Sequence, residues 1–246
     1  MNLYGQYCPV ARATELLADR WTLLIVRELL ADIRRFNDLD RGLPGISRGL
    51  LVERLRRLEQ TGVVERRPGA PGRPVEYRLT SAGRQLQLVI DVLGGWGARW
   101  AFGEPRPAEL DPVVLLWWMK RRVHMQRLPP ARTVIEFEFH GERSGSYWLV
   151  LERSDVSVCL QHPKFEITLR VVADIRAFYR VWLGRIPLDD ALRIRAVRLE
   201  GSPQAVRGFA RWFSWSPMAP AVRAALRAGP GARRRRPRRV QVAAAS

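Results

Sequence analysis

The sequence has very little cysteine, and its two cysteines, Cys8 and Cys159, are far apart in the chain. Two cysteines are too few for the disulfide framework of a small secreted protein, so a reducing cytoplasm is the expected compartment. Long apolar runs are also lacking, because the run at residues 112–119 is far shorter than the ~20 residues that span a bilayer. The first twenty residues lack the charged start and apolar stretch of a signal peptide. We therefore expect a cytoplasmic chain that does not insert into a membrane.

Catalytic groups are scarce as well. The chain has three histidines, His124, His140 and His162, which fall in different predicted elements. No set of nucleophile, base and orienting group can be assembled around them. Neither a phosphate-binding loop nor a metal-ligand spacing occurs, and the pair at residues 189–190 follows a turn, where a helix cap is the expected role. We predict a protein that is not an enzyme and needs no cofactor or metal.

Positive charge, in contrast, is abundant, with 42 Lys and Arg against 24 Asp and Glu. Residues 1–103 and 104–219 each carry a net charge of +5, and residues 220–246 carry +8 with no acid at all. A polyanionic partner is favoured, but charge alone does not distinguish DNA from RNA or an anionic membrane surface. The tail, with six arginines at 233–236 and 238–239, is expected to be disordered and to add non-specific attraction to DNA.

The length of 246 residues favours two domains. We predict an α+β protein with an N-terminal winged helix-turn-helix domain at 1–103, a linker at 104–110, a second α+β domain at 111–225 and a basic disordered tail at 226–246. Helical spacing indicates helices near 11–18 and 21–30, which are two short helices or one interrupted helix, and another near 35–39. Ser47 is placed to cap a further helix that runs to about Gln60, and Thr80 or Ser81 is placed to cap the helix after the hairpin. Strand-like runs at 63–67 and 74–79 then predict a hairpin, and a longer helix follows to about Trp100.

The order of helices, turn, helix and hairpin is that of a winged helix-turn-helix module. In the helix after the turn, Leu51, Leu55 and Leu58 share one buried stripe, and the opposite face is polar and partly basic. Recognition helices usually enter the major groove by their N-terminal end, and arginines in the turn and hairpin suit phosphate contacts. The predicted DNA-binding residues are Arg34, Arg35, Ser47, Arg48, Gly49, Val52, Glu53, Arg56, Arg57, Arg66, Arg67 and Arg73.

Several motifs of this segment resemble the HxlR family of winged helix-turn-helix transcription regulators, in order and at the family's spacing. They lie at residues 8–10, 21–25, 35–39, 43–47, 55–59, 62–64 and 75–80. The resemblance covers about residues 7–100 and implies a homodimer on a two-fold related operator. It also implies a dimer contact formed by the first helix and the helix around 82–100, where the candidate residues are Leu86, Val89, Ile90, Leu93 and Trp96. The alternative is that the second domain covers these side chains.

The Cys-Pro element of this family serves some members as a sensor of oxidants or electrophiles. Here the resemblance points to Cys8, whose chemistry would require a thiolate. The nearest basic residue, Arg12, is four positions away. A structural role for Cys8 is favoured, because the second domain offers another place for sensing.

The second segment is rich in bulky apolar residues, which exceed what a core needs and could line a ligand cavity. The candidate ligand-binding residues are Trp117, Trp118, Phe137, Trp148, Phe178 and Trp182. Motifs at 146–149, 172–174, 182–184, 188–192 and 199–201 resemble the sterol carrier protein fold, although their residues are common ones. That resemblance implies a five-stranded sheet with helices on one face and an apolar tunnel for a lipid-like molecule.

Together these observations predict a DNA-binding transcriptional regulator whose operator affinity is set by a hydrophobic effector in residues 111–219. For such regulation the ligand must bind two dimer conformations unequally. One alternative makes the second domain a packing or dimerisation module, with Cys8 as the sensor. Another, from a different functional class, is a lipid carrier with a vestigial helix-turn-helix.

Overall fold

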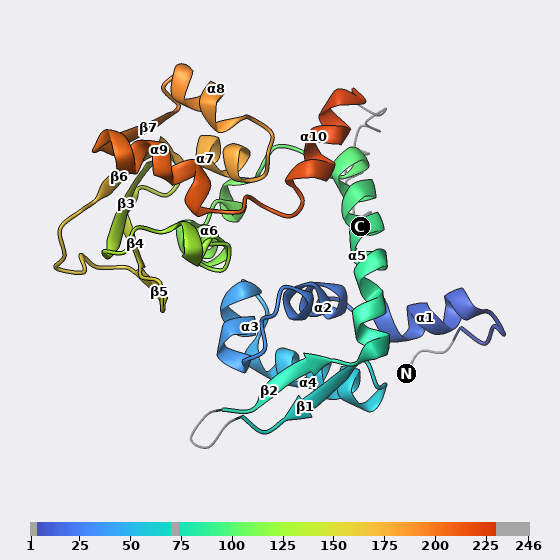
Figure 1. Ribbon diagram of the computed structural model, residues 1–246. Coiled ribbons are helices and arrows are strands. Elements are labelled where there is room, and N and C mark those ends of the chain that lie inside the picture. The colour runs from blue at the N-terminus through green and yellow to red at the C-terminus, as the bar shows by residue number, and fades with distance from the viewer. Residues whose placement is uncertain (1–3, 70–73, 230–246) are drawn as a thin grey trace, which may run out of the picture.

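The computed structural model describes residues 4–69 and 74–229. Figure 1 shows a smaller helical part that carries a two-stranded hairpin and a larger part built on a sheet, with the long helix α5 running beside both. The first part contains α1 (Pro9–Leu17), α2 (Thr22–Leu30), α3 (Phe36–Gly42), α4 (Arg48–Gln60), β1 (Val64–Arg67), β2 (Glu76–Leu79) and α5 (Ser81–Trp100). The mixed α+β composition agrees with the sequence prediction.

Two predicted helix caps are present. The Ser47 hydroxyl accepts the Leu50 N–H at 3.2 Å at the start of α4, and the Thr80 hydroxyl accepts the Gly83 N–H at 3.2 Å at the start of α5. Each cap satisfies a backbone donor that the helix itself leaves unpaired. Between α3 and α4, Gly45 adopts φ +91°, a conformation that glycine tolerates without steric cost. Local chemistry therefore fixes where the fourth and fifth helices begin.

The first core lies among α2, α3, α4 and the hairpin. Ile25, Leu39, Leu51 and Leu55 are almost completely buried there, and β1 pairs with β2 in antiparallel register. The stripe predicted for the helix after the turn, Leu51, Leu55 and Leu58, is entirely in this core. The outer face of α4 is consequently turned away from it.

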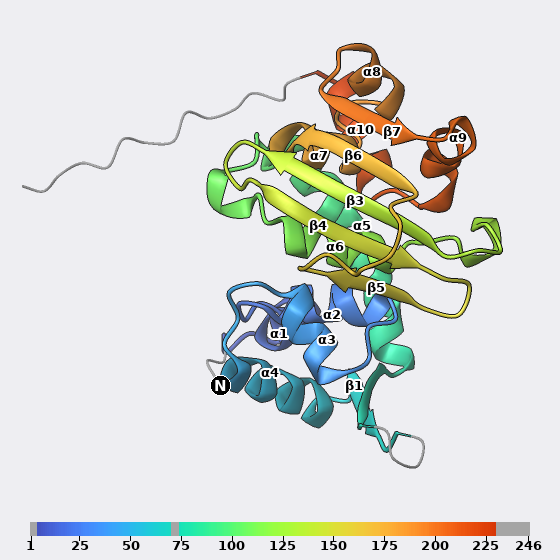
Figure 2. The ribbon, with the colours of Figure 1, turned by 90° about the vertical axis from the view of Figure 1, so that its left-hand side faces the viewer.

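The second part is organised around a five-stranded sheet in the order β5-β4-β3-β6-β7, in which β3 and β6 are parallel and the other neighbours are antiparallel. Figure 2 shows this sheet in front of α6 and α7. Its elements are η1 (Pro107–Glu109), α6 (Pro112–Lys120), η2 (Met125–Arg127), β3 (Thr133–His140), β4 (Gly145–Leu151), β5 (Val156–Cys159), β6 (Leu169–Asp174), α7 (Ile175–Trp182), α8 (Leu188–Arg193), β7 (Val197–Gly201), α9 (Pro203–Trp212) and α10 (Ala219–Arg227).

One face of the sheet carries the main core, where alternate residues of β3, such as Phe137 and Phe139, pack against α6, α7 and α9. On the opposite face Val134, Trp148 and Val150 form a small separate cluster. The alternation follows from the two-residue period of a strand. The five strands expected from sequence are thus present, with helices on the face that holds the larger core.

Several boundaries differ from the sequence prediction. The helix expected near 111–125 ends at Lys120, because the next residues pair with the chain after α9. The His124 N–H donates to the Trp212 carbonyl at 2.7 Å, and the Ser214 N–H donates to the Arg122 carbonyl at 2.7 Å. The sequence predicted a helix cap at residues 189–190, and these residues lie in the first turn of α8. Helix α10 was not predicted. Leu226 and Arg227, which were predicted to begin the disordered tail, belong instead to α10. The six arginines at 233–236 and 238–239 lie outside the described residues.

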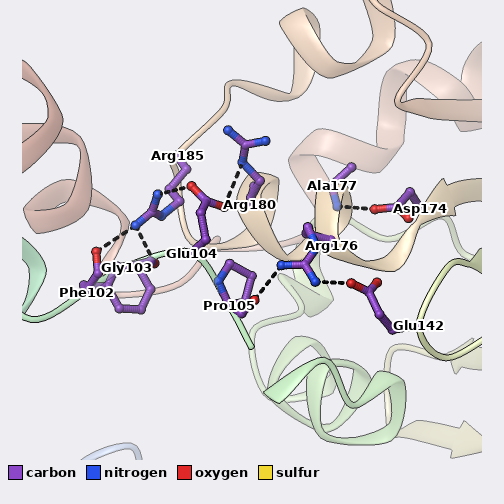
Figure 3. A network of polar contacts seen from close by, with 10 residues as sticks. All are labelled: Phe102, Gly103, Glu104, Pro105, Glu142, Asp174, Arg176, Ala177, Arg180 and Arg185. Carbon is purple, nitrogen blue, oxygen red and sulfur yellow. Dashed lines mark hydrogen bonds and ion pairs between the residues drawn. The ribbon is translucent and has the colours of Figure 1, made fainter. Parts of the chain in front are cut away.

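The segment predicted as a linker is held in place rather than free. Arg185 ion-pairs with Glu104 at 2.7 Å and donates to the carbonyl groups of Phe102 and Gly103. Arg176 donates to the Pro105 carbonyl at 2.5 Å (Figure 3). Leu110 is fully buried in the second core. These contacts fix the end of α5 against α7 and the turn that follows it.

Candidate nucleic-acid interface

The helix α4 and the β1–β2 hairpin lie at the end of the molecule away from the five-stranded sheet (Figures 1 and 2). The candidate side chains of α4 differ in how accessible they are. Arg48, Gly49, Glu53 and Arg56 are exposed, and Val52 is half-buried. Ser47 is exposed at the N-cap. The polar face that the sequence predicts is therefore on the surface, beginning at the helix N-terminus.

Arg48 is oriented by three neighbours from α3. Its guanidinium bonds the Asp40 carboxylate at 3.0 Å and the Asn37 side-chain oxygen at 3.1 Å, and it lies 4.9 Å from the centre of the Phe36 ring. Its side chain nevertheless remains 63% exposed. Asn37 and Asp40 were not among the predicted site residues, although Asn37 lies in the motif at 35–39. An arginine that is exposed yet positioned needs little ordering when it meets a ligand.

Arg57 has a different environment from the other arginines of α4. It pairs with Asp19 and donates to the Glu15 carbonyl, and these contacts attach α4 to α1 and the turn after it. Arg54, which the sequence prediction omitted, joins this network through Asp19, Glu53 and the Arg20 carbonyl. Both arginines hold helices together within the chain.

The hairpin presents a second group of cations. Arg66 is exposed and makes no ion pair with the described residues, whereas Arg67 pairs with Glu65 at 2.7 Å. Arg34 pairs with Asp32 at 2.5 Å and lies 3.9 Å from Glu76, and Arg35 is half-buried next to it. The Arg78 hydrogen bond, followed by the charges of Arg34 and Arg35, lowers the pKa of Glu76. Arg73 lies outside the described residues.

The apolar face of α5 is open over most of its length. Leu88 and Val92 are 72% and 74% exposed, and Val89, Leu93 and Trp96 are exposed beside them. These side chains share one stripe at helical spacing. Ile90, in contrast, is buried in the first core, and Leu86 packs against that core. Of the predicted contact residues, Val89, Leu93 and Trp96 remain accessible, and Leu88 and Val92 were missed.

Cys8 is the N-cap residue of α1 and is half-buried, and its side chain makes no capping hydrogen bond. Within the described residues, no group of three or more His, Cys, Asp or Glu side chains could hold a metal ion. Over the same residues, no helix has the length and apolar character needed to cross a bilayer.

The six predicted ligand-binding residues are not brought together. Phe137 and Phe178 are buried in the main core and meet edge to face, with ring centres 5.7 Å apart, and Trp148 lies on the other face of the sheet. Trp117 lies against Arg41, Lys120 and Arg121 at the contact with the first part. Only Trp118 and Trp182 line the cavity of about 560 Å³ between the two parts of the chain.

A family model described as HxlR-like helix-turn-helix matches residues 16–104. An uncharacterized HTH-type transcriptional regulator of Mycobacterium tuberculosis is 49% identical over 108 residues, which are 43% of this chain and 65% of that protein. The HTH-type transcriptional regulators YvaP and YodB of Bacillus subtilis are 38% and 39% identical. Those two matches cover 39% and 40% of this chain, and 91% and 88% of the respective relatives.

Among solved structures, the reduced form of YodB from B. subtilis is 35% identical, with a TM-score of 0.35, and the match covers 39% of this chain and 96% of that one. The family model ends at residue 104, so the five-stranded sheet lies beyond it. The chain spans somewhat less than two thirds of the length of the Mycobacterium tuberculosis relative. Through its first hundred residues, the chain belongs to the HxlR-like family of DNA-binding helix-turn-helix transcriptional regulators.

Proposed function

We propose that the chain is a cytoplasmic, homodimeric transcriptional regulator that reads an operator through residues 1–103. The observation that carries the proposal is the exposed N-terminal end of α4, with Ser47, Arg48 and Gly49 on the surface beside the basic hairpin. Side chains at that end of a recognition helix meet base edges first. Arg56 continues the same exposed face about two turns further along the helix.

The cations divide into two roles in this proposal. Arg66 on β1 is exposed and without an ion pair among the described residues, so it suits a phosphate contact. Arg57 is engaged with Asp19 and serves the fold instead. Phosphate contacts supply affinity that falls with salt, whereas base contacts supply sequence preference. The two roles therefore have different experimental signatures.

The second copy of the chain would cover the open face of α5. With Trp100, which is also exposed, the stripe on α5 has six large apolar side chains, each more than a third exposed, and is a larger apolar surface than a scattered exposed residue. Tyr4, Tyr7 and Val10, before and at the start of α1, are exposed as well, so the first helix can contribute. A two-fold contact of this kind would place two α4 helices on two half-sites of one operator.

Residues 111–225 would respond to a hydrophobic small molecule and change operator affinity. The five strands, and the helices on the face that holds the larger core, agree with what the resemblance to the sterol carrier fold implies. An interior that stays closed to every small molecule would instead favour a packing or dimerisation module, with Cys8 as the sensor.

The test is fluorescence anisotropy with a DNA duplex selected by the full chain from a random-sequence library. We expect affinity that falls with salt, and a slope of log affinity against log salt that decreases by about 1 in Arg66→Gln. Arg207→Gln, an exposed arginine on α9, is the matched control and should leave the slope unchanged. Absent or salt-insensitive binding by the wild-type chain would contradict the proposal and favour the lipid-carrier alternative.

A further inference from the structure

The cavity between the two parts of the chain has walls from α2, α5, α6 and α7 and from the segment that enters α10 (Figure 1). Its volume of about 560 Å³ is in the range of small-molecule sites, which are ~300–1,000 Å³. Trp118, Leu30 and Met218 supply apolar surface. It is therefore formed only when both parts are present, and it touches the helix-turn-helix directly through α2.

One end of this cavity has an excess of arginine around a single buried acid. The Glu28 side chain is 5% exposed and pairs with Arg27 at 2.8 Å and Arg121 at 2.7 Å. Arg122, a third arginine in the wall, makes no ion pair or side-chain hydrogen bond with the described residues. Burial lowers the pKa of Arg122, and the charge of Glu28 only partly offsets that effect. Arg122 is thus a half-buried cation without a counterion of its own.

Two further acids line the cavity, but both are exposed and already have partners. Asp32 pairs with Arg34 at 2.5 Å, and Asp91 accepts a hydrogen bond from Gln87 at 2.8 Å. Neither is placed to neutralise Arg122. An anionic group that enters the cavity would gain a charge-assisted hydrogen bond in a partly desolvated site, where such bonds are stronger than in water.

We infer that this cavity binds an apolar molecule with a single carboxylate, whose acid group pairs with Arg122 and whose apolar body lies against Trp118, Leu30 and Met218. The combination of one unpaired guanidinium with aromatic and thioether walls suits such an amphipathic acid better than a neutral lipid. That this molecule acts as the effector rests on the proposed function. The site and the class of ligand do not.

The position of the cavity gives the ligand a route to the DNA-binding helices. Arg121, next to Arg122, donates to Glu28 of α2 and, at 3.0 Å, to the Asp38 carbonyl of α3. Space for this contact depends on Gly42, because a Cβ there would lie 2.5 Å from a Glu28 carboxylate oxygen. A carboxylate beside Arg122 would compete with Glu28 for the neighbouring guanidinium groups and so alter the hold of α6 on α2 and α3.

Isothermal titration calorimetry of the full chain tests the inference with 1-naphthoate and decanoate as acids and 1-naphthalenemethanol as the uncharged analogue. We expect at least one acid to bind, and Arg122→Gln to weaken it about tenfold or more. Binding of the alcohol should be weaker than that of 1-naphthoate and insensitive to Arg122→Gln. Arg207→Gln is the matched control and should bind as the wild type does.

A second variant guards against loss of folding in Arg122→Gln. Ala31→Trp adds bulk at an exposed position of the cavity wall without removing a core contact, and it should abolish binding of acid and alcohol alike. Binding that is insensitive to both substitutions, equal binding of acid and alcohol, or no binding of either acid at millimolar concentration would overturn the inference. Operator anisotropy in saturating acid is measured separately. Unchanged DNA affinity there would contradict the effector role and leave the site standing, whereas an absence of DNA binding would contradict the proposed function.

Discussion

Two glycines of the first part have opposite surroundings. A Cβ built on Gly83 would lie 2.2 Å from the Val63 carbonyl oxygen and 2.9 Å from the Leu79 side chain, so α5 can approach the hairpin only without a side chain there. Gly49, at the exposed start of α4, has nothing within 4 Å of that position. Gly83 therefore allows α5 to pack closely against the hairpin. No contact within the chain requires a glycine at position 49, whereas close approach of DNA to the helix backbone would require one.

Alanine at these two positions should therefore have opposite effects on stability. Gly83→Ala is expected to lower the free energy of unfolding by about 1–3 kcal/mol, because backbone must shift to admit the methyl group. Gly49→Ala is expected to raise it by up to about 1 kcal/mol, because alanine favours the helix. Urea denaturation measures both changes.

Operator affinity should not follow stability at Gly49. We expect Gly49→Ala to weaken operator binding even though the protein is more stable. Unchanged or tighter DNA binding in this variant would contradict close approach at the start of α4.

At the scale of elements, local signals predicted the helix-turn-helix well. Ser47 and Thr80 are residue types that cap helices, and they stand just before α4 and α5. Leu51, Leu55 and Leu58 recur at the helical spacing of a buried face. Such information lies within a few residues of the element that it determines, so sequence alone reveals it.

Elements that depend on distant partners were predicted less well. Helix α10 has few large apolar residues, and it packs beside α5. Met218, at the start of α10, lies so close to Gly94 of α5 that a Cβ on Gly94 would be 2.7 Å from the Met218 sulfur. The early end of α6 likewise depends on pairing of residues 122–124 with 212–214. The cavity was missed for the same reason, since its arginine cluster joins α2 to the end of α6. No local pattern encodes these contacts.

Helix α5 gives the third prediction, because its apolar stripe is open in a single chain. Leu93→Glu should convert a dimer into a monomer, since two carboxylates would be brought into an apolar two-fold contact. Light scattering coupled to size-exclusion chromatography measures the mass. Ile194→Glu, at another exposed apolar position just after α8, is the control and should remain dimeric.

Operator affinity of Leu93→Glu should fall together with the dimer, because one chain reaches only one half-site. A wild-type chain that is monomeric at micromolar concentration, or a Leu93→Glu variant that stays dimeric, would contradict the proposed dimer face.

At the scale of the whole molecule, a few charged contacts connect the DNA-binding part to the sheet. Arg121 is 14% exposed and bridges α2 and α3 from the end of α6, and Arg176 and Arg185 fix the segment after α5. Partly buried ion pairs contribute little net stability in many proteins, but removal of one partner is costly because the other remains desolvated. These pairs are therefore suited to fix the relative position of the two parts.

The fourth prediction concerns this connection. Arg121→Ala should lower the free energy of unfolding by about 3 kcal/mol, because Glu28 loses a partner while it stays buried. The double variant Glu28→Gln with Arg121→Ala should lose less than the sum of the single changes, since both act on one contact. Thermal and denaturant unfolding measure the cycle, and simple additivity would contradict the coupling.

In the proposed mode of binding, α4 reads bases while the hairpin binds the phosphate backbone. The most direct measurement is the base preference at each operator position, obtained by selection from a random DNA library with wild type, Arg56→Ala and Arg66→Gln. We predict that Arg56→Ala relaxes preference at particular positions, by about 1–3 kcal/mol for a lost base contact, and that Arg66→Gln weakens all sequences alike. A base preference that is identical in wild type and Arg56→Ala, or one that changes only in Arg66→Gln, would contradict this mode of binding.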